Sequence, residues 1–220
     1  MCFRIALIAP DADTIAKTAG AVVDEWGDEG WKPRYNIAIT SKHPLIVRQG
    51  AVLHLSPATW GRPSAKGITA NTRSDTLLNS DIYSKQLLRK PCIIPASGFY
   101  EWKKVGKARY PYHIQRKDKS LLWLAGIYWN DTPYSQFSII TTNANQQMIP
   151  LHDRMPLILT TEEFGDWFDS PLQRLHEEHS VELIFTPVSQ RVNSVQNDGP
   201  DCQTPTVEPP APPPTFFENE

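Results

Sequence analysis

Short strand-like runs bounded by turn residues fill the middle of this chain, and their spacing limits the folds that it can adopt. Between positions 92 and 141 they cover residues 92–94, 98–103, 112–115, 121–128 and 137–141. This spacing predicts a mostly antiparallel sheet that curls toward a barrel. Shorter strands are expected at residues 35–39, 45–48 and 51–55, with an opening strand at 2–8 and a last strand at 183–188.

Helices are expected at only a few places. Asp11 or Asp13 can cap a first helix that reaches about residue 26, and Thr160 or Thr161 can cap a helix that reaches residue 168. Two further helices are expected at residues 79–88 and 170–179. A strand-rich chain with few helices predicts an α+β fold.

Length and composition predict one folded domain followed by a tail. A chain of 220 residues with 40% hydrophobic side chains can bury one core, which we place at residues 1–200. From Asp201 to Glu220 the sequence holds six prolines and four acidic residues but no basic one. We therefore expect residues 201–220 to be a disordered, Pro-rich acidic tail.

The sequence indicates a soluble, intracellular protein. No stretch reaches the ~18 uncharged apolar residues of a membrane span, and the N-terminus lacks the pattern of a signal peptide. The three cysteines, at positions 2, 92 and 202, are too far apart for a disulfide framework or a CxxC metal site. A reducing compartment such as the cytoplasm fits this pattern. We expect Cys92 to be a small buried hydrophobe and Cys202 a tail residue without a role.

Charge is segregated along the chain, although the formal net charge is only -2. Residues 31–120 hold 17 Lys or Arg against 4 Asp or Glu, a net of +13, whereas residues 121–200 hold 3 basic and 10 acidic residues. A basic block of this kind is typical of a face that binds a polyanion such as nucleic acid. The alternative is that folding mixes these charges with acids from the other blocks.

Cys2 carries the most distinctive chemistry. A small residue at this position permits removal of Met1, which leaves an α-amine and a thiol on one residue. Such an amine, with a pKa near ~8, can condense with an aldehyde to an imine. The thiol can then add to the imine and close a five-membered thiazolidine. The alternative is a cysteine with no role.

The run from Pro95 to Trp102 places Glu101 among aromatic and small residues. Such surroundings disfavour the charged form of a carboxyl group, which can then act as a general acid or base near neutrality. An ordinary ion pair at a strand end is equally compatible with the sequence.

The run from Leu151 to Pro156 combines an imidazole, a carboxylate and a guanidinium. His152 could move protons during imine formation, and Arg154 could hold a phosphate or orient Glu101. A structural ion pair at a bend is the alternative.

Three more residues are candidates for contacts with nucleic acid. Asn71 can donate to and accept from a ring-opened sugar, and Arg73 can grip a phosphate in a bidentate way. Trp60 is a candidate stacking surface for an unpaired base, although most tryptophans lie in a core.

Taken together, these pieces resemble the SOS-response-associated peptidase (SRAP) family, and the likeness spans residues 1 to about 200. The matching residues are Met1-Cys2 with Arg4, residues 34–36, Asn71 with Arg73, residues 95–102, 141–142, 144–145, 152–156 and 188–200. The combination is far more specific than any one piece.

The resemblance implies a sensor of abasic sites in single-stranded DNA that cross-links through Cys2 and shields the lesion at replication forks, near the nucleoid. It implies an α+β barrel-like domain, a monomer, and no metal or nucleotide cofactor. Cys2, Glu101, His152 and Asn71 would be catalytic. The candidate DNA-contacting residues are Arg4, Asn36, Trp60, Asn71, Arg73 and Arg154.

Four departures from the family pattern stand out. Phe3 replaces the usual glycine after the cysteine, which adds bulk beside the nucleophile. The segment that follows Trp60 is shorter than in the family, so the insertion of this segment into DNA as a wedge is in doubt. Ile39 stands where proline is usual, and Asp75 replaces a typical Glu.

Other functions remain open on the sequence alone. The imine route also allows strand cleavage as a lyase. A thiol peptidase could use Cys2 with His152 and Glu101, with its own N-terminus as substrate, and the basic block could serve a non-covalent reader of modified bases. The pair His176 and His179 is more typical of a solvated helix end than of a metal site.

Overall fold

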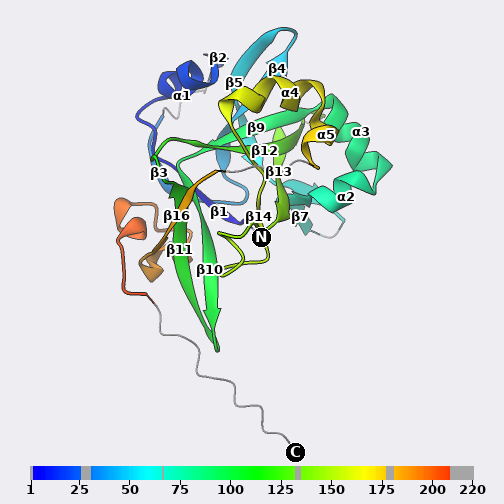
Figure 1. The fold of residues 1–220 in the computed structure, drawn as a ribbon. Coiled ribbons are helices and arrows are strands. Elements are labelled where there is room, and N and C mark those ends of the chain that lie inside the picture. Colours follow the sequence, from blue (N-terminus) through cyan, green and yellow to red (C-terminus); the bar gives the residue numbers. More distant parts are fainter. Residues whose placement is uncertain (1, 26–30, 66, 132–134, 177–180, 209–220) are drawn as a thin grey trace, which may run out of the picture.

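Two β-sheets that contribute to one core make up most of the computed structural model (Figure 1). The structure describes residues 2–25, 31–65, 67–131, 135–176 and 181–208. The larger sheet runs in the order β14 (Arg154–Pro156), β13 (Gln136–Asn143), β12 (Leu122–Trp129), β9 (Pro91–Ala96), β4 (Lys42–Gln49), β5 (Val52–Trp60) and β2 (Ala21–Val23). Off this path, β15 (Ile158–Leu159) pairs with β12, and β8 (Asn71–Arg73) pairs with β13.

The larger sheet closes on itself. Strand β13 pairs in parallel with β5, with Gln136 opposite Thr59 and Phe137 opposite Trp60. The strands β13, β12, β9, β4 and β5 therefore form a ring, and the pairs within this ring other than β13–β5 are antiparallel. Closure removes exposed strand edges, so the predicted barrel-like sheet corresponds to this ring.

The smaller sheet carries the beginning of the chain. Its order is β16 (Leu183–Pro187), β11 (Ala108–Arg116), β10 (Gly98–Val105), β1 (Arg4–Leu7) and β3 (Arg34–Ala38). A two-stranded ribbon joins β6 (Arg62–Ser64) to β7 (Gly67–Thr69). The chain passes from the larger to the smaller sheet between β9 and β10. There Gly98 permits a close approach, because a Cβ at this position would lie only 2.7 Å from the carbonyl oxygen of Ile114.

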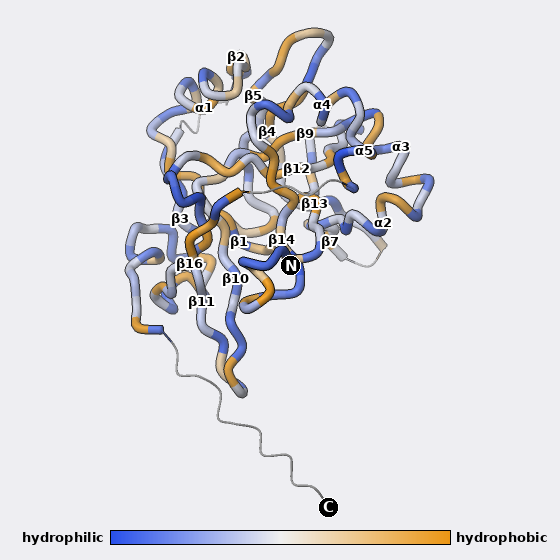
Figure 2. Tube along the Cα trace, in the orientation of Figure 1, coloured by the Kyte–Doolittle hydropathy of each residue, from blue (hydrophilic) through white to orange (hydrophobic). Residues whose placement is uncertain are grey.

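Strands β9 and β12 form the centre of the core. Every residue of both strands is buried, and Figure 2 shows hydrophobic residues gathered along this part of the ring. A strand that is apolar on both faces must be covered on both sides. The smaller sheet and the short helices supply much of this cover.

The first helix is shorter than expected. Helix α1 (Ala12–Ala19) begins at the predicted cap Asp11, whose side chain accepts from the backbone N–H of Thr14 at 2.7 Å. It ends at Gly20, which has a φ of 66°, a left-handed conformation that favours glycine. Residues 21–23 then pair with β5 as β2. The predicted continuation toward residue 26 is therefore wrong, because β-branched residues form a strand instead.

The other helices are short. They are α2 (Ser74–Leu78), α3 (Asp81–Arg89), α4 (Phe164–Asp169) and α5 (Pro171–Arg174), with 3-10 turns η1 (Thr161–Glu163), η2 (Gln190–Asn193) and η3 (Pro200–Gln203). Thr160 is the predicted cap of the η1–α4 segment, and its N–H donates to the Glu163 side chain at 2.7 Å. The predicted helix at 170–179 is observed only at α5, and its residues 177–180 lie outside the described part. Among the described residues, no helix has the length and hydropathy to cross a bilayer.

The C-terminal segment packs on the domain further than expected. Cys202 is fully buried in a second small cluster with Ala6, Tyr100 and Val192, and Gln203 donates to the Tyr100 hydroxyl at 3.0 Å. Residues 201–208 therefore belong to the folded unit, which corrects the predicted boundary at residue 200 and the view of Cys202 as a tail residue. The rest of the predicted tail, residues 209–220, lies outside the described residues.

Candidate active site around Cys2

Cys2 lies at the start of β1, where the chain enters the smaller sheet. Strand β1 pairs with β10 on one side and β3 on the other, and the Cys2 side chain is fully buried in the main core. Its thiol lies 3.7 Å from the carbonyl oxygen of Arg4, to which it donates. Burial raises the pKa of the Cys2 thiol well above its usual range, and the Glu101 charge adds to this rise. The resting thiol is therefore protonated.

Glu101 places a carboxyl group close to Cys2. Its strand, β10, neighbours β1 (Figure 1), and the side chain is 4% exposed. Burial raises the pKa of Glu101 to about 7, although the positive charge of the chain terminus opposes the rise. Both protonation states are populated near neutrality, which suits a group that gives and takes protons.

Asn71 connects β8 to the first residues of the chain. Strand β8 is held by β13, with Asn71 opposite Ile139, and Asn71 Nδ2 donates to the carbonyl oxygen of Cys2 at 2.8 Å. Its Oδ1 is buried without a hydrogen-bond partner among the described atoms. A buried acceptor left unpaired costs about 1–3 kcal/mol. This oxygen is therefore ready to accept from a ligand hydroxyl or amine.

His152 lies just before β14, and burial lowers its pKa, with the positive chain terminus as the next cause. Its Nδ1 accepts from the backbone N–H of Arg154 at 2.9 Å and also lies 2.8 Å from Asp153 Oδ1. One nitrogen cannot accept from the amide and donate to the carboxylate at the same time. The backbone contact is fixed by the fold, whereas the Asp153 side chain is 88% exposed and free to turn. The neutral ring therefore carries its proton on Nε2.

The guanidinium of Arg154 is buried and makes its hydrogen bonds inside the protein. Its guanidinium donates to the Thr141 carbonyl oxygen at 2.5 Å and to Asn143 Oδ1 at 2.6 Å, and the residue is 4% exposed. It therefore braces β14 against β13. Its Nε is buried without a hydrogen-bond partner among the described atoms, so the expected phosphate contact from Arg154 stays a prediction beside this positioning role.

Arg73 is exposed and held by its neighbour Asp75. Its Nε and Nη2 contact the Asp75 carboxylate at 3.0 and 2.8 Å, and the hydrogen bond from Arg73 lowers the pKa of Asp75 to about 2. Asp75 also lies 3.9 Å from Arg154. The contact to Asp75 uses Nε and Nη2, which leaves Nη1 of this exposed residue without a partner among the described atoms and open to a phosphate.

Arg4 and Asn36 turn inward. Arg4 donates to Asn36 Oδ1 at 2.8 Å and to the Val192 carbonyl oxygen at 2.7 Å. Asn36 is 1% exposed, and its Nδ2 donates to carbonyl oxygens of residues 192, 194 and 197. Both residues fasten residues 190–198 to the smaller sheet. The structure shows these structural contacts, and the expected DNA contacts of Arg4 and Asn36 stay predictions.

Trp60 is a core residue. It is fully buried, stacks on Phe137 with an interplanar angle of 8°, and donates from Nε1 to the Ala70 carbonyl oxygen at 2.9 Å. A ring with no exposed face cannot stack on a base, so the predicted stacking surface is wrong.

Sequence reasoning missed two supporting residues. Asn143 fixes Arg154, and Asp198 accepts from the backbone N–H groups of Tyr35 and Asn36 at 2.6 and 2.8 Å. Asn143 lies 11 residues from Arg154, whereas the contacts of Asp198 span more than 160 residues. Only the stretch around Asp198 carried a signal, as part of the motif at 188–200.

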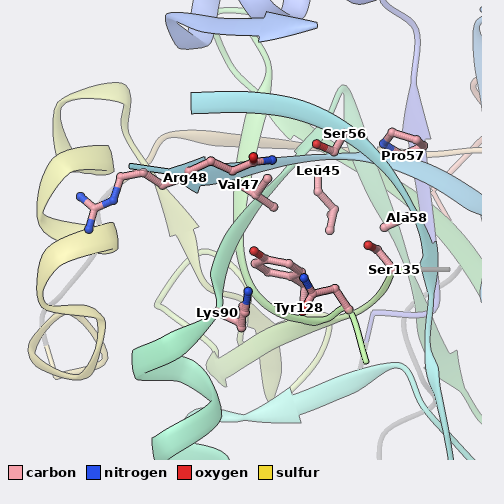
Figure 3. A pocket seen from close by; sticks show the side chains of 11 residues that line it. Leu45, Val47, Arg48, Ser56, Pro57, Ala58, Lys90, Tyr128 and Ser135 are labelled. Carbon is pink, nitrogen blue, oxygen red and sulfur yellow. The ribbon is translucent and has the colours of Figure 1, made fainter. Parts of the chain in front are cut away.

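A cavity of about 370 Å³ lies away from Cys2, at the end of the ring where β13 begins. Figure 3 shows its floor formed by Leu45, Val47 and Tyr128, with Lys90 beside the Tyr128 ring and Arg48 turned away toward α4. Its lining contains no cysteine, histidine or carboxylate. The cavity therefore takes no part in the chemistry at Cys2. Within the described residues, no group of three or more His, Cys, Asp or Glu could hold a metal ion.

Fold and site define a mixed α+β domain with a buried cysteine just before its first strand, flanked by an amide and a buried carboxyl group. The profile of the family described as SOS response associated peptidase (SRAP) matches residues 1–195. The chain therefore belongs to the SRAP family.

Relatives extend this result over almost the whole chain. The abasic site processing protein YoqW of Bacillus subtilis is 34% identical over 222 residues, which cover 91% of this chain and 98% of that protein. The abasic site processing protein HMCES of Gallus gallus is 31% identical, with 82% and 69% covered. A crystal structure of a Bacteroides thetaiotaomicron protein superposes with a TM-score of 0.77 at 25% identity, covering 94% of this chain and all of that one. The α+β prediction is thus confirmed.

Proposed function

We propose that this protein captures abasic sites in single-stranded DNA through Cys2, once Met1 has been removed. The ring-opened sugar of an abasic site is an aldehyde, and a terminal cysteine offers both an amine and a thiol to it. The observation that carries the proposal is the placement of Cys2 between Asn71 and Glu101. The names of the relatives as abasic site processing proteins support the substrate.

The amine of Cys2 acts first. It attacks the sugar aldehyde carbon, and loss of water gives an imine. Because the resting thiol of Cys2 is protonated, it does not compete as a nucleophile at this stage. Glu101 lies close enough to Cys2 for its charge to raise the pKa of the thiol, and the proposal assigns to Glu101 and His152 the proton transfers that this step requires.

The thiol closes the ring. Once the imine is protonated, its positive charge favours the thiolate beside it. The Cys2 sulfur then bonds to the former aldehyde carbon, the thiol proton passes to Glu101, and the imine nitrogen becomes a ring amine. Asn71 Oδ1, buried and unpaired among the described atoms, is a natural acceptor for a sugar hydroxyl. The product is a thiazolidine.

Strand cleavage competes with ring closure. The imine acidifies the proton on the neighbouring sugar carbon, so removal of that proton expels the 3′ phosphate, as in a lyase. Attack by the thiol consumes the imine and stops this route. The proposal therefore assigns shielding of the lesion to the thiol and residual lyase activity to the amine.

A heat-stable shift in a denaturing gel tests the proposal. Wild-type protein lacking Met1 should form a stable adduct with single-stranded DNA that holds one abasic site. Cys2→Ala keeps the amine, so it should form an adduct only when a borohydride traps the imine. The matched control Cys202→Ala, at another buried cysteine, should behave like wild type. If heat destroys the wild-type adduct, ring closure is refuted. If Cys2→Ala loses only the removal of Met1, the alternative function of a peptidase acting on its own N-terminus is favoured.

A further inference from the structure

The hairpin formed by β10 and β11 extends beyond the sheet to which it belongs (Figure 1). Strand β10 pairs with β1 only at Gly98 and Phe99, and β11 pairs with β16 only from Tyr112 onward. Residues 103–110 therefore pair only with each other. We call residues 103–110 the arm.

The arm is built to be stiff. Val105 pairs with Ala108, so two residues make the turn, and the first of them, Gly106, has a φ of 59°. A two-residue turn with glycine at its first position matches the twist of the strands on either side. The base of the arm therefore fixes where its tip points.

The arm presents cations that the fold itself does not use. Lys104, Lys107 and Arg109 are exposed, and none of their side chains makes an ion pair or hydrogen bond with another described residue. Lys104 lies directly opposite Arg109. Like charges that face each other across a strand pair destabilise a sheet. Folding alone thus gives no reason for this arrangement, whereas an anionic partner would stabilise it.

Lys103 is the exception on the arm. Its Nζ lies 3.0 Å from Glu208 Oε1, and the Tyr112 hydroxyl donates to the same oxygen at 2.5 Å. This lysine is already neutralised by the C-terminal segment. It is therefore left out of the set of free cations.

The arm begins two residues after Glu101 of the candidate active site. Glu101, beside Cys2, is on the same strand as Lys104, three residues away, and six residues before Lys107. At about 3.3 Å per strand residue, Lys104 lies roughly 10 Å along the hairpin from Glu101, and Lys107, in the turn, roughly 15 Å. DNA repeats its phosphates every ~3.4 Å along each strand of a duplex. A strand bound at Cys2 can therefore reach the arm within about six nucleotides.

We propose that the arm binds the sugar-phosphate backbone of the DNA strand on one side of the abasic site. Lys104, Lys107 and Arg109 supply sequence-independent contacts that hold the strand while Cys2 reacts. This inference rests on the function proposed above, to which it adds how the strand is positioned. It assigns part of the basic block of the sequence to one defined surface.

The test compares two variants that lose the same positive charge. The arm variant combines Lys104→Gln, Lys107→Gln and Arg109→Gln. The control variant combines Lys17→Gln, Lys85→Gln and Arg89→Gln, which are exposed residues on α1 and α3. Fluorescence anisotropy measures the binding of unmodified single-stranded DNA of about 15 nucleotides over a series of salt concentrations. Unmodified DNA has no aldehyde, so this measurement does not depend on the chemistry at Cys2.

The arm variant should bind about tenfold more weakly at low salt, and its slope of log K against log salt should fall by about 2, or ~0.7 for each lost contact on a single strand. In the control variant, the affinity and the slope should each change by less than half of these amounts. Equal slopes for arm variant and control would overturn the proposal.

Cross-linking at saturating DNA separates this inference from the proposed function. If the arm variant binds weakly but reaches the wild-type yield of adduct, both stand. If it binds like the control and cross-links normally, only the arm is refuted. If wild type gives no adduct while the arm variant still loses affinity, the proposed function is refuted and the arm remains a DNA-binding surface. Thermal unfolding of both variants verifies that they are folded.

Discussion

Asn71 donates a 2.8 Å hydrogen bond to the carbonyl oxygen of Cys2, across 69 residues of sequence. The bond fixes the first residues of the chain against β8, which is itself held by β13. It leaves Oδ1 of the same amide buried and without a partner among the described atoms. In the proposed function, this one side chain positions the nucleophile and offers an acceptor to the substrate.

Replacing Asn71 by alanine should slow cross-linking. The change removes the bond to Cys2 and the free acceptor, and one hydrogen bond contributes about 1 kcal/mol. We expect the rate of adduct formation to fall about tenfold, measured from gel time courses at saturating DNA. Asn130→Ala, at an exposed residue beside the distant cavity, should leave the rate unchanged. A wild-type rate in Asn71→Ala would exclude this role.

Glu101 should make stability depend on pH. Its pKa is raised from 4.5 to about 7 by burial, so the folded state holds the proton more tightly than the unfolded state. The contribution of Glu101 to the free energy of unfolding is therefore fully present below about pH 4.5 and is lost as the pH rises through about 7. At about 1.4 kcal/mol per pKa unit, the decline amounts to about 3 kcal/mol.

Glu101→Gln removes this dependence, since the amide resembles the protonated acid. Urea unfolding at several pH values should show the variant about 3 kcal/mol more stable than wild type near pH 8. The difference should vanish near pH 4.5. The titrations of all other groups cancel in this comparison. A difference that stays constant with pH would mean that the carboxyl group titrates normally.

The local pattern of the sequence was sufficient for most strands, but not for the way they close. Alternating and apolar runs predicted β9 to β13 within a few residues. Burial on one or both faces of a strand determines whether each position is polar or apolar, so the sequence shows it. The parallel pairing of β13 with β5 joins segments about 80 residues apart. No local pattern encodes it. Likewise, Gly20 ended α1 early, although the helical pattern continued into Val22 and Val23.

For the site, residue chemistry identified three residues that the structure brings together, and it misjudged the surroundings of others. Cys2, Asn71 and Glu101 were recognised, and the structure brings them together. Arg4 and Trp60 were expected to face DNA, yet both are used inside the protein. A cation or an aromatic ring has the same sequence signature whether it is buried or exposed. The outcome depends on distant carbonyl groups that no motif shows.

Trp60 should affect stability rather than DNA binding. Trp60→Ala should lower the free energy of unfolding by about 3–5 kcal/mol, as is usual for a buried aromatic residue. Trp60→Phe keeps the stacking on Phe137 and loses only the bond to Ala70. Its affinity for single-stranded DNA should stay within about twofold of wild type. A large loss of affinity in a stably folded Trp60→Phe protein would revive the stacking role.

The C-terminal segment should stabilise the domain up to Glu208. A chain ending at residue 199 loses the burial of Cys202 and the contacts of Gln203 and Glu208. We expect it to unfold at lower urea concentration, with a loss of at least about 2 kcal/mol. A chain ending at residue 208 keeps every one of these contacts and should match the full chain. Equal stability of the two truncated chains would place the domain boundary back at residue 200.

The central claim is that Cys2 captures the aldehyde with both its amine and its thiol. Intact-mass analysis of the protein incubated with single-stranded DNA that holds one abasic site tests it most directly. The account predicts a species with the mass of the protein without Met1 plus the DNA minus one water, with fragmentation placing the bond at Cys2, and this species should survive heating, as the imine of the same mass does not. Protein that retains Met1 should give no such species. An adduct on another residue, or an equal yield from the Met1-containing protein, would contradict the account.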